Sequence, residues 1–249
     1  MTAAPRPSGP RVSYLVDALA MGVQGAPPLV FRNVDVRENP DHPDNRLNLR
    51  VDVGQVVLCL GDEDSGVGEL GKFVIGLDQP PAGQVLVYGT AIHDLSYDEQ
   101  LVFRRRLGYT QIGDGLLQNQ TLRNNVALPL DYASDHRLAE VAARIGRLVA
   151  EFELTDVADR RPAQVNEEDR RRAAVARAIA LDPELLVMEA PFDGLTGRSA
   201  RFLLERAARR EDGSPRAIFI TAQDVTPAVA PMITRTVLLV DGVAVEGGK

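Results

Sequence analysis

The most informative stretch of the sequence for the fold is RRAAVARAIALDPELLVMEAPFDGL, residues 171–195. Its first part closes a mostly helical region, residues 121–181, and its second part contains the apolar run ELLVME, which predicts a buried strand. After it the sequence predicts a helix in SARFLLERAARR, a strand in RAIFITA and a closing hairpin in RTVLLVDGVAVEG. Because strands alternate with helices, we expect an α/β fold with a largely parallel sheet.

The chain before this stretch continues the alternation. Strands are predicted in LVFRNVDV and LNLRVDV, where apolar and polar residues alternate, and in the buried-type run QVVLCLG. A helix is predicted from about Gly66 to Ile75, followed by a turn and strand in DQPPAGQVLVYG and a short strand near RLGYTQ. One apolar face of the helical region is formed by Leu138, Val141, Ile145, Leu148 and Phe152, with Ser134 or Asp135 as N-cap.

Composition narrows the classes of function. The 249 residues are 45% apolar, enough for one sizeable core or a core with a small satellite domain. The net charge of −7 argues against a general nucleic-acid surface, so we expect no nucleic-acid partner. Cys59 is the only cysteine, which predicts a buried strand residue and fits a reducing cytoplasm. No apolar run approaches the roughly 18–20 residues needed to span a bilayer.

The first 28 residues are rich in Ala, Pro and Gly and are predicted to be an N-terminal leader. Within it Val12, Leu15, Val16, Leu19 and Val23 fall on one helical face, as in a short amphipathic docking helix. We favour a partly disordered tail, because so short a helix is marginal alone. The folded domain is then predicted to cover residues 29–248.

Three segments of the chain resemble those of a known family. Residues 171–195 resemble the segment that follows the signature motif and runs through Walker B in the ATP-binding subunits of ABC transporters. GLDQPPAGQVLVYG, residues 76–89, resembles the stretch after the Walker A helix, and residues 107–130 resemble the Q-loop region. These segments follow one another in the family's order. NVALPL within the last of them resembles branches that handle lipids, lipoproteins or small solutes.

This resemblance implies an ABC-ATPase-like P-loop NTPase fold. Such a fold has a mainly parallel core sheet, an antiparallel β subdomain and an inserted helical subdomain, here at approximately residues 113–172. It also implies that the glycine-rich loop GDEDSGVGE, residues 61–69, stands where the family binds phosphate. The loop positions that correspond are Gly61, Asp64, Ser65, Gly66, Val67, Gly68 and Glu69.

The residue types in this loop differ from those of the family. The phosphate-binding Lys aligns with Val67, the Mg²⁺-binding Ser or Thr with Gly68, and the next residue is Glu69. Asp62, Glu63 and Asp64 add further negative charge, so the shape of the loop is plausible while its charge is reversed. Two unit charges 4 Å apart interact by about 4 kcal/mol at an effective dielectric constant near 20. We therefore expect micromolar triphosphate binding to be lost.

The other family positions are also replaced. The Q-loop Gln aligns with Ile112, with Gln111 one residue early, and the Walker B Asp aligns with Glu189. The catalytic Glu aligns with Ala190, and no aromatic residue for stacking on adenine is evident in residues 36–45. The D-loop Asp aligns with Thr196, and the switch His aligns with Gln223. The Ser-Gly-Gly of the signature motif aligns with Asn166, Glu167 and Glu168.

The same parts of the sequence allow several other interpretations. A phosphate loop shifted to Gly66–Phe73 would use Lys72, but Phe73 cannot bind Mg²⁺, and a solvent-facing Lys72 is the simpler prediction. Asp62, Asp64 and Glu189 are weak metal candidates without the full pattern of a calcium loop. The three histidines, His42, His93 and His136, are too scattered for a metal cluster. We expect Arg170, Arg171 and Arg172 to pair with the carboxylates beside them.

The sequence therefore predicts a pseudo-ATPase, with no cofactor, that serves as a structural or regulatory partner of a transporter or of another ATPase subunit. The expected partners are an ABC permease, an ATPase subunit or a second copy of the chain. The expected place is the cytoplasm, at the membrane's inner face through a permease. One alternative is a functional ATP-binding subunit of the lipid, lipoprotein or small-solute branch, with atypical motifs, ATP and Mg²⁺. Another is a stand-alone protein-interaction domain.

Overall fold

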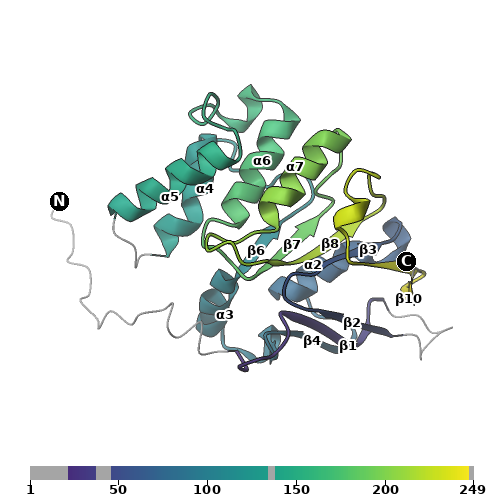
Figure 1. Cartoon of the computed structure of the whole chain (residues 1–249). Coiled ribbons are helices and arrows are strands. Elements are labelled where there is room, and N and C mark those ends of the chain that lie inside the picture. The colour runs from purple at the N-terminus through teal and green to yellow at the C-terminus, as the bar shows by residue number, and fades with distance from the viewer. Residues whose placement is uncertain (1–21, 38–45, 134–137, 247–249) are drawn as a thin grey trace.

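Two β-sheets organise the computed structural model, which describes residues 22–37, 46–133 and 138–246 (Figure 1). The larger sheet has six strands in the order β10-β9-β3-β8-β7-β6. Its neighbours pair in parallel except for the closing β9–β10 hairpin. The strands are β3 (Val56–Leu60), β6 (Leu107–Thr110), β7 (Leu185–Glu189), β8 (Ala217–Ala222), β9 (Arg235–Val240) and β10 (Val243–Glu246). The predicted α/β class with a mainly parallel core sheet is confirmed.

The smaller sheet is antiparallel, as the resemblance implied. It comprises β1 (Leu29–Asp35), β2 (Leu47–Val51), β4 (Ala82–Val87) and β5 (Thr90–Ala91), in the order β2-β1-β4-β5. In Figure 1 it lies below the parallel sheet. The Phe31 and Phe219 rings, one from each sheet, have centroids 5.3 Å apart, so the two sheets share a core.

Helices cover the parallel sheet on both faces. They are α2 (Val67–Ile75), α3 (Tyr97–Phe103), α4 (Leu122–Tyr132), α5 (Leu138–Glu151), α6 (Glu167–Ala178) and α7 (Gly197–Ala207), with short 3₁₀ turns η1 (Glu63–Ser65), η2 (Ile92–Asp94), η3 (Arg104–Arg106), η4 (Pro162–Gln164) and η5 (Ala230–Met232). Alternate residues of β3 serve separate cores: Leu58 packs with α4 to α7, and Val57 packs with α2 and the antiparallel sheet. None of the described helices is long and apolar enough to cross a membrane.

The predicted helical insert corresponds to α4, α5 and α6, at the top of Figure 1. Val141, Leu148 and Phe152 are buried on the predicted apolar face, and Ile145 is half-buried. Helix α6 continues through the predicted boundary at residue 172 to Ala178, and the domain boundaries remain predictions. The proposed N-caps at residues 134 and 135, and the leader up to residue 21, lie outside the described residues.

The order of the strands determines where the loops meet. Strands β3, β8, β7 and β6 are neighbours and run in parallel, so their carboxyl ends share one edge of the sheet. The glycine-rich loop follows β3, Gln223 follows β8, Ala190 follows β7 and Gln111 follows β6. Residues from four distant segments of the chain are therefore brought to one place.

Candidate functional site

A cleft of about 550 Å³ opens at this edge of the sheet, and we call it the strand-end cleft. It gathers many of the positions that the sequence singled out. Thr196 and the signature-like loop, residues 166–168, are not among the described residues that line it. The lining comprises Arg37, Asp62, Glu63, Gly66, Val67, Gly68, Glu69, Lys72, Ile112, Glu189, Ala190, Asp193, Thr221, Ala222 and Gln223.

The glycine-rich loop forms hydrogen bonds within itself. Its first part is the turn η1, in which the Ser65 amide and the Ser65 hydroxyl both donate to the Asp62 carbonyl, at 3.2 and 2.7 Å. The Ser65 hydroxyl in turn accepts the Val67 amide at 3.2 Å. A Cβ on Gly61 would lie 2.1 Å from that hydroxyl, so only glycine fits there. The Ser65 and Val67 amides are therefore already used by the loop.

Val67 lies where the resemblance places the phosphate-binding lysine. Its side chain is 5% exposed and packs in the core beneath the loop. The neighbouring acidic side chains face the other way: Asp62, Glu63 and Asp64 are exposed. Arg37, just after β1, donates to the Glu63 carbonyl at 3.1 Å and lies 4.0 Å from the Asp64 carboxylate. An arginine therefore lies over the loop, and it belongs to the segment, residues 36–45, in which no aromatic residue is evident.

Lys72 differs from its prediction as a simple solvent-facing residue. It lines the strand-end cleft, and its Nζ donates to both carboxylate oxygens of Glu69, at 3.0 and 3.1 Å. Glu69 and Lys72 are three residues apart on α2, so their side chains share a helix face. The cleft contains five carboxyl groups and two cationic groups, and this lysine is already paired with one of those carboxylates.

Glu189 ends β7 at the floor of the cleft and is 4% exposed. Burial raises the pKa of its carboxyl group, and the charge of Glu69 acts in the same direction. Hydrogen bonds from the Tyr109 hydroxyl and the Ile112 amide, with the charge of Lys72, oppose that rise in pKa without cancelling it. The Oε1 atom is buried with no hydrogen-bond partner among the described residues. Glu189 is thus a poorly satisfied buried acid.

Ala190 and Gln223 complete the side of the cleft next to Glu189. Ala190 has a left-handed φ of +42°, and it is held by its amide, which donates to the Thr221 carbonyl at 2.7 Å. Its carbonyl accepts a hydrogen bond from Arg171 at 3.1 Å. Its side chain is only a methyl group, so this position offers no carboxylate to polarise a water molecule. Ile112 is 63% exposed and offers no polar side chain either.

The signature-like loop begins α6 and is stabilised by its own charges. The Asn166 side chain accepts the Asp169 amide at 2.8 Å as the N-cap. The predicted internal pairing is confirmed for two arginines: Arg171 lies 3.6 Å from Glu167, and Arg172 pairs with Glu168. The prediction is wrong for Arg170, which pairs with Asp114 at 3.1 Å.

Thr196, at the D-loop position, acts as the N-cap of α7. Its side chain accepts the Ser199 amide at 3.2 Å. The weak metal candidates Asp62, Asp64 and Glu189 do not form a cluster, because the described residues hold no group of three or more His, Cys, Asp or Glu suited to a metal ion. Cys59 is buried in β3 as predicted, and burial raises the pKa of its thiol to about 12.

Sequence reasoning missed two features of the cleft. Arg37 carried no signal, because it follows β1 and reaches the loop only in the folded chain. Lys72 did carry one, since it lies one helical turn after Gly68 and therefore on the same side of α2.

The order of elements and the strand-end cleft place this chain among α/β proteins of the P-loop NTPase kind. The model of the ABC transporter family matches residues 45–193, and the chain belongs to this family. The methionine import ATP-binding protein MetN 1 of Rhodococcus jostii is 31% identical over 204 residues, which are 81% of this chain and 59% of that protein. The uncharacterized ABC transporter ATP-binding protein YvcR of Bacillus subtilis is 30% identical over 197 residues, 78% of this chain and 74% of that one.

The solved structures agree with the fold. A dimeric post-hydrolysis structure of the ATP-binding cassette MJ0796, bound to ADP and Pi, has a TM-score of 0.74 and 23% identity. The match covers 89% of this chain and all of that one, and it shows the fold alone. The chain spans between half and three fifths of the length of the methionine and sulfate import relatives that it matches.

Proposed function

We propose that this chain is a pseudo-ATPase, a member of the ABC transporter family that does not hydrolyse ATP. The observation that carries the proposal is the charge of the strand-end cleft, which has five carboxyl groups against Arg37 and Lys72. In this proposal the chain is a structural or regulatory partner of a permease or of an active ATPase subunit. Association with the inner face of the membrane would then come through that partner.

Electrostatics supports the loss of nucleotide binding. A triphosphate placed along the glycine-rich loop would meet Asp62, Glu63 and Glu69 near a position where the family has a lysine. One such contact at 4 Å is worth about 4 kcal/mol at an effective dielectric constant near 20. That energy corresponds to nearly three powers of ten in affinity, since each tenfold change is about 1.4 kcal/mol. The residues present do not fit a bound Mg²⁺-ATP.

The loss of hydrolysis has separate support. Phosphoryl transfer depends on groups that position water and stabilise charge in the transition state. Ala190 offers a methyl group, Ile112 an alkyl chain and Gln223 a neutral amide at the positions concerned. A change at one position could be offset elsewhere, but with changes at all three none of these positions offers a general base for the reaction.

A functional ATP-binding subunit is the second candidate, and the comparisons favour it. The MetN 1 and YvcR relatives and a sulfate/thiosulfate import relative are named as ATP-binding proteins, at 30–31% identity. Two local features also favour it. Lys72 brings a cation into the strand-end cleft, and the Oε1 of Glu189, which has no hydrogen-bond partner among the described residues, is an oxygen that a metal ion could use. In this candidate ATP and Mg²⁺ are the cofactors, and the chain drives import or export through a permease.

Calorimetric titration with Mg²⁺-ATP, together with a phosphate-release assay, separates the two candidates. We expect no binding tighter than about 100 μM, which corresponds to roughly 5.5 kcal/mol, and no turnover. Binding tighter than that limit, or turnover that is abolished by a substitution in residues 61–69, would establish the second candidate. Co-purification from native membranes tests the permease separately, since a stand-alone interaction domain would bring none with it.

A further inference from the structure

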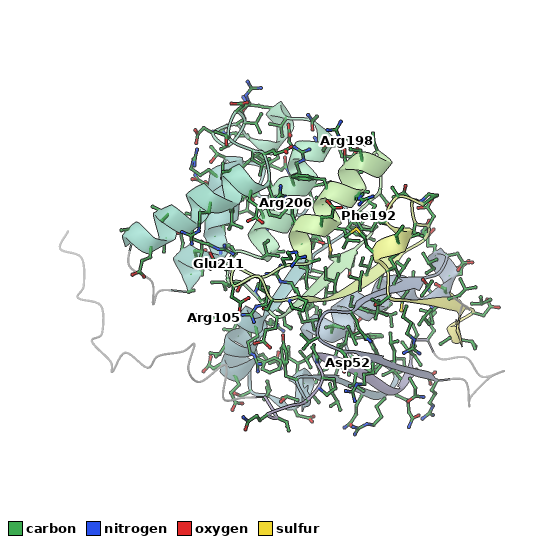
Figure 2. All side chains as sticks on the ribbon, in the orientation of Figure 1. Asp52, Arg105, Phe192, Arg198, Arg206 and Glu211 are labelled. Atoms are coloured by element: carbon green, nitrogen blue, oxygen red, sulfur yellow. The ribbon has the colours of Figure 1, made fainter. Side chains whose placement is uncertain are left out.

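A second polar cavity lies away from the strand-end cleft, where α5 meets the segments after α6 and α7. Its volume is about 190 Å³. Figure 2 labels Glu211, which lines it, next to α5. Five arginines line this space, which we call the arginine cavity: Arg144, Arg147, Arg209, Arg210 and Arg216.

Two of these arginines are fixed by backbone carbonyl groups. Arg144 is 8% exposed and donates to the Ile179 and Ala180 carbonyls, at 3.1 and 3.2 Å. Arg216 is 1% exposed and donates to three carbonyls, those of Pro183, Ala207 and Arg209, at 2.7, 2.6 and 3.0 Å. Both guanidinium groups are therefore held rigidly at the wall of the cavity by the ends of α6 and α7.

The carboxylates around the cavity are shared rather than matched one to one. Glu211 is 2.6 Å from Arg144 and 2.9 Å from Arg147. Asp182 is 2.7 Å from Arg216 and 3.4 Å from Arg210.

Two further carboxylates and one further arginine lie around the arginine cavity. Glu184 lies 3.8 Å from Arg210, and Glu151 lines the cavity near Arg144. Arg209 has no ion pair with a carboxylate in the described part of the chain. Five guanidinium groups thus face four carboxylates, and each of the two central carboxylates is divided between two arginines. Guanidinium N–H donors are in excess of the acceptors available to them.

We propose that the arginine cavity binds a single tetrahedral oxyanion, namely a phosphate group. Arginine presents its donors in a planar fork that matches the oxygens of phosphate. The volume of about 190 Å³ is below the roughly 300–1,000 Å³ of pockets for drug-sized ligands, so the site accommodates one phosphate group and not a nucleotide. The donors for the anion come from Arg147 and Arg209, whose side chains donate to no backbone carbonyl in the described part of the chain, and Arg210, which already donates to the Asp182 carbonyl at 3.5 Å, lies beside them.

A bound phosphate group would join two parts of the fold. Arg147 belongs to α5, whereas Arg209 and Arg210 belong to the turn between α7 and β8. At present Glu211 makes that link through its ion pairs with α5. An anion between the arginines would add a second link, and would hold the helical insert more firmly against the parallel sheet. The phosphate group could be free phosphate or the headgroup of a lipid.

Inorganic phosphate added to the full-length chain tests the proposal. Calorimetry should show saturable phosphate binding, and the Tm should rise with phosphate but not with chloride at equal ionic strength. The double variant Arg147→Gln/Arg209→Gln removes the two exposed donors and should weaken binding at least tenfold. Arg198→Gln removes one exposed positive charge at the far end of α7 (Figure 2) and should leave binding unchanged.

A vesicle arm distinguishes the two sources of the phosphate group. Sedimentation with vesicles that contain phosphatidic acid, against vesicles of phosphatidylcholine alone, reports binding to a headgroup. Binding of free phosphate or of phosphatidic acid vesicles that is lost in the double variant supports the proposal and identifies the source. No saturable binding in either arm overturns it. Binding that is equal in the double variant also overturns it, because the anion then lies elsewhere, for example at residues 61–69.

Discussion

At the scale of one residue, Glu189 is a buried acid whose hydrogen bonding is incomplete. It is a carboxyl group at the end of a central strand, almost without solvent, and one of its oxygens has no partner among the described residues. A buried acid of this kind favours its neutral form, which is why burial raises the pKa of Glu189. The folded chain therefore binds this proton more tightly than the unfolded chain does.

Linkage gives the sign of the resulting pH dependence. A raised pKa in the folded state means that stability falls as pH rises from the unfolded value of about 4.3 through the folded value. Glu189→Gln removes the titration, so this variant should be more stable than the parent near pH 7, by about 1 kcal/mol. The difference should shrink as pH falls toward 4. Urea unfolding at pH 7 and pH 4 measures it.

Glu140→Gln provides the matched control for this prediction, because Glu140 is an exposed acid on α5. It should show no comparable gain at pH 7. A loss of stability in Glu189→Gln at pH 7 would mean that the ionised carboxylate is stabilising, and would contradict the role of burial assigned here.

Val67 and Gly68 provide a second prediction at the same scale. The double variant Val67→Lys/Gly68→Ser returns the family's residue types to the glycine-rich loop. It should not bring back hydrolysis, because Ala190 and Gln223 remain in place, and phosphate release should stay at the level of buffer. Adding Ala190→Glu and Gln223→His to this double variant tests whether the side chains at positions 190 and 223 are what hydrolysis lacks. Turnover in the double variant alone would show that the roles are wrongly aligned.

Helix α2 allows a prediction at the scale of an element, because it contains two glycines in different surroundings. A Cβ at Gly68 would meet nothing within 4 Å, whereas a Cβ at Gly71 would lie 2.3 Å from the Glu189 Oε1. Gly68→Ala should stabilise the chain by about 0.5 kcal/mol through helix propensity. Gly71→Ala should destabilise it by about 1–3 kcal/mol, since the added Cβ would also lie 3.1 Å from the Cγ and the Cδ of Glu189 and would displace that side chain.

Thermal and urea unfolding of the two variants side by side measure both effects. The pair controls itself, because the substitution and the helix are the same. A stabilising Gly71→Ala would mean that the Glu189 side chain moves aside at little cost, and that the floor of the strand-end cleft is looser than described.

The elements also show what the sequence could predict. The run QVVLCLG and the residues that follow Gly66 identified β3 and α2, because burial and helical periodicity leave a direct trace in the residue pattern. The glycine-rich loop was located, but its internal bonding was not, because the Ser65 contacts depend on the turn that the loop adopts. Arg170 was assigned to a neighbour and instead pairs with Asp114, 56 residues earlier. Spacing along the chain does not reveal such contacts.

At the scale of the whole molecule, acidic residues occur both in the strand-end cleft and in the signature-like loop. The family resemblance implies that two copies associate with the strand-end cleft of one facing the signature-like loop of the other. Here the cleft contributes five carboxyl groups, and the loop contributes Glu167 and Glu168. Arg171 and Arg172 neutralise that loop in part, but they are already engaged within their own copy.

This distribution predicts that the chain does not form an ATP-dependent homodimer. Bringing the two acidic surfaces together costs free energy, because each pair of like charges near 4 Å opposes contact by about 4 kcal/mol at an effective dielectric constant near 20. Light scattering after size-exclusion chromatography should give the monomer mass at micromolar concentration, with or without Mg²⁺-ATP, in 150 mM salt. The same measurement in 1 M salt, where the Debye length is about 3 Å, shows whether charge is the obstacle. A dimer that appears with ATP at 150 mM salt would contradict both the repulsion between the acidic surfaces and the proposed lack of nucleotide binding. Association that appears only at 1 M salt would show that repulsion between the acidic residues keeps two copies apart.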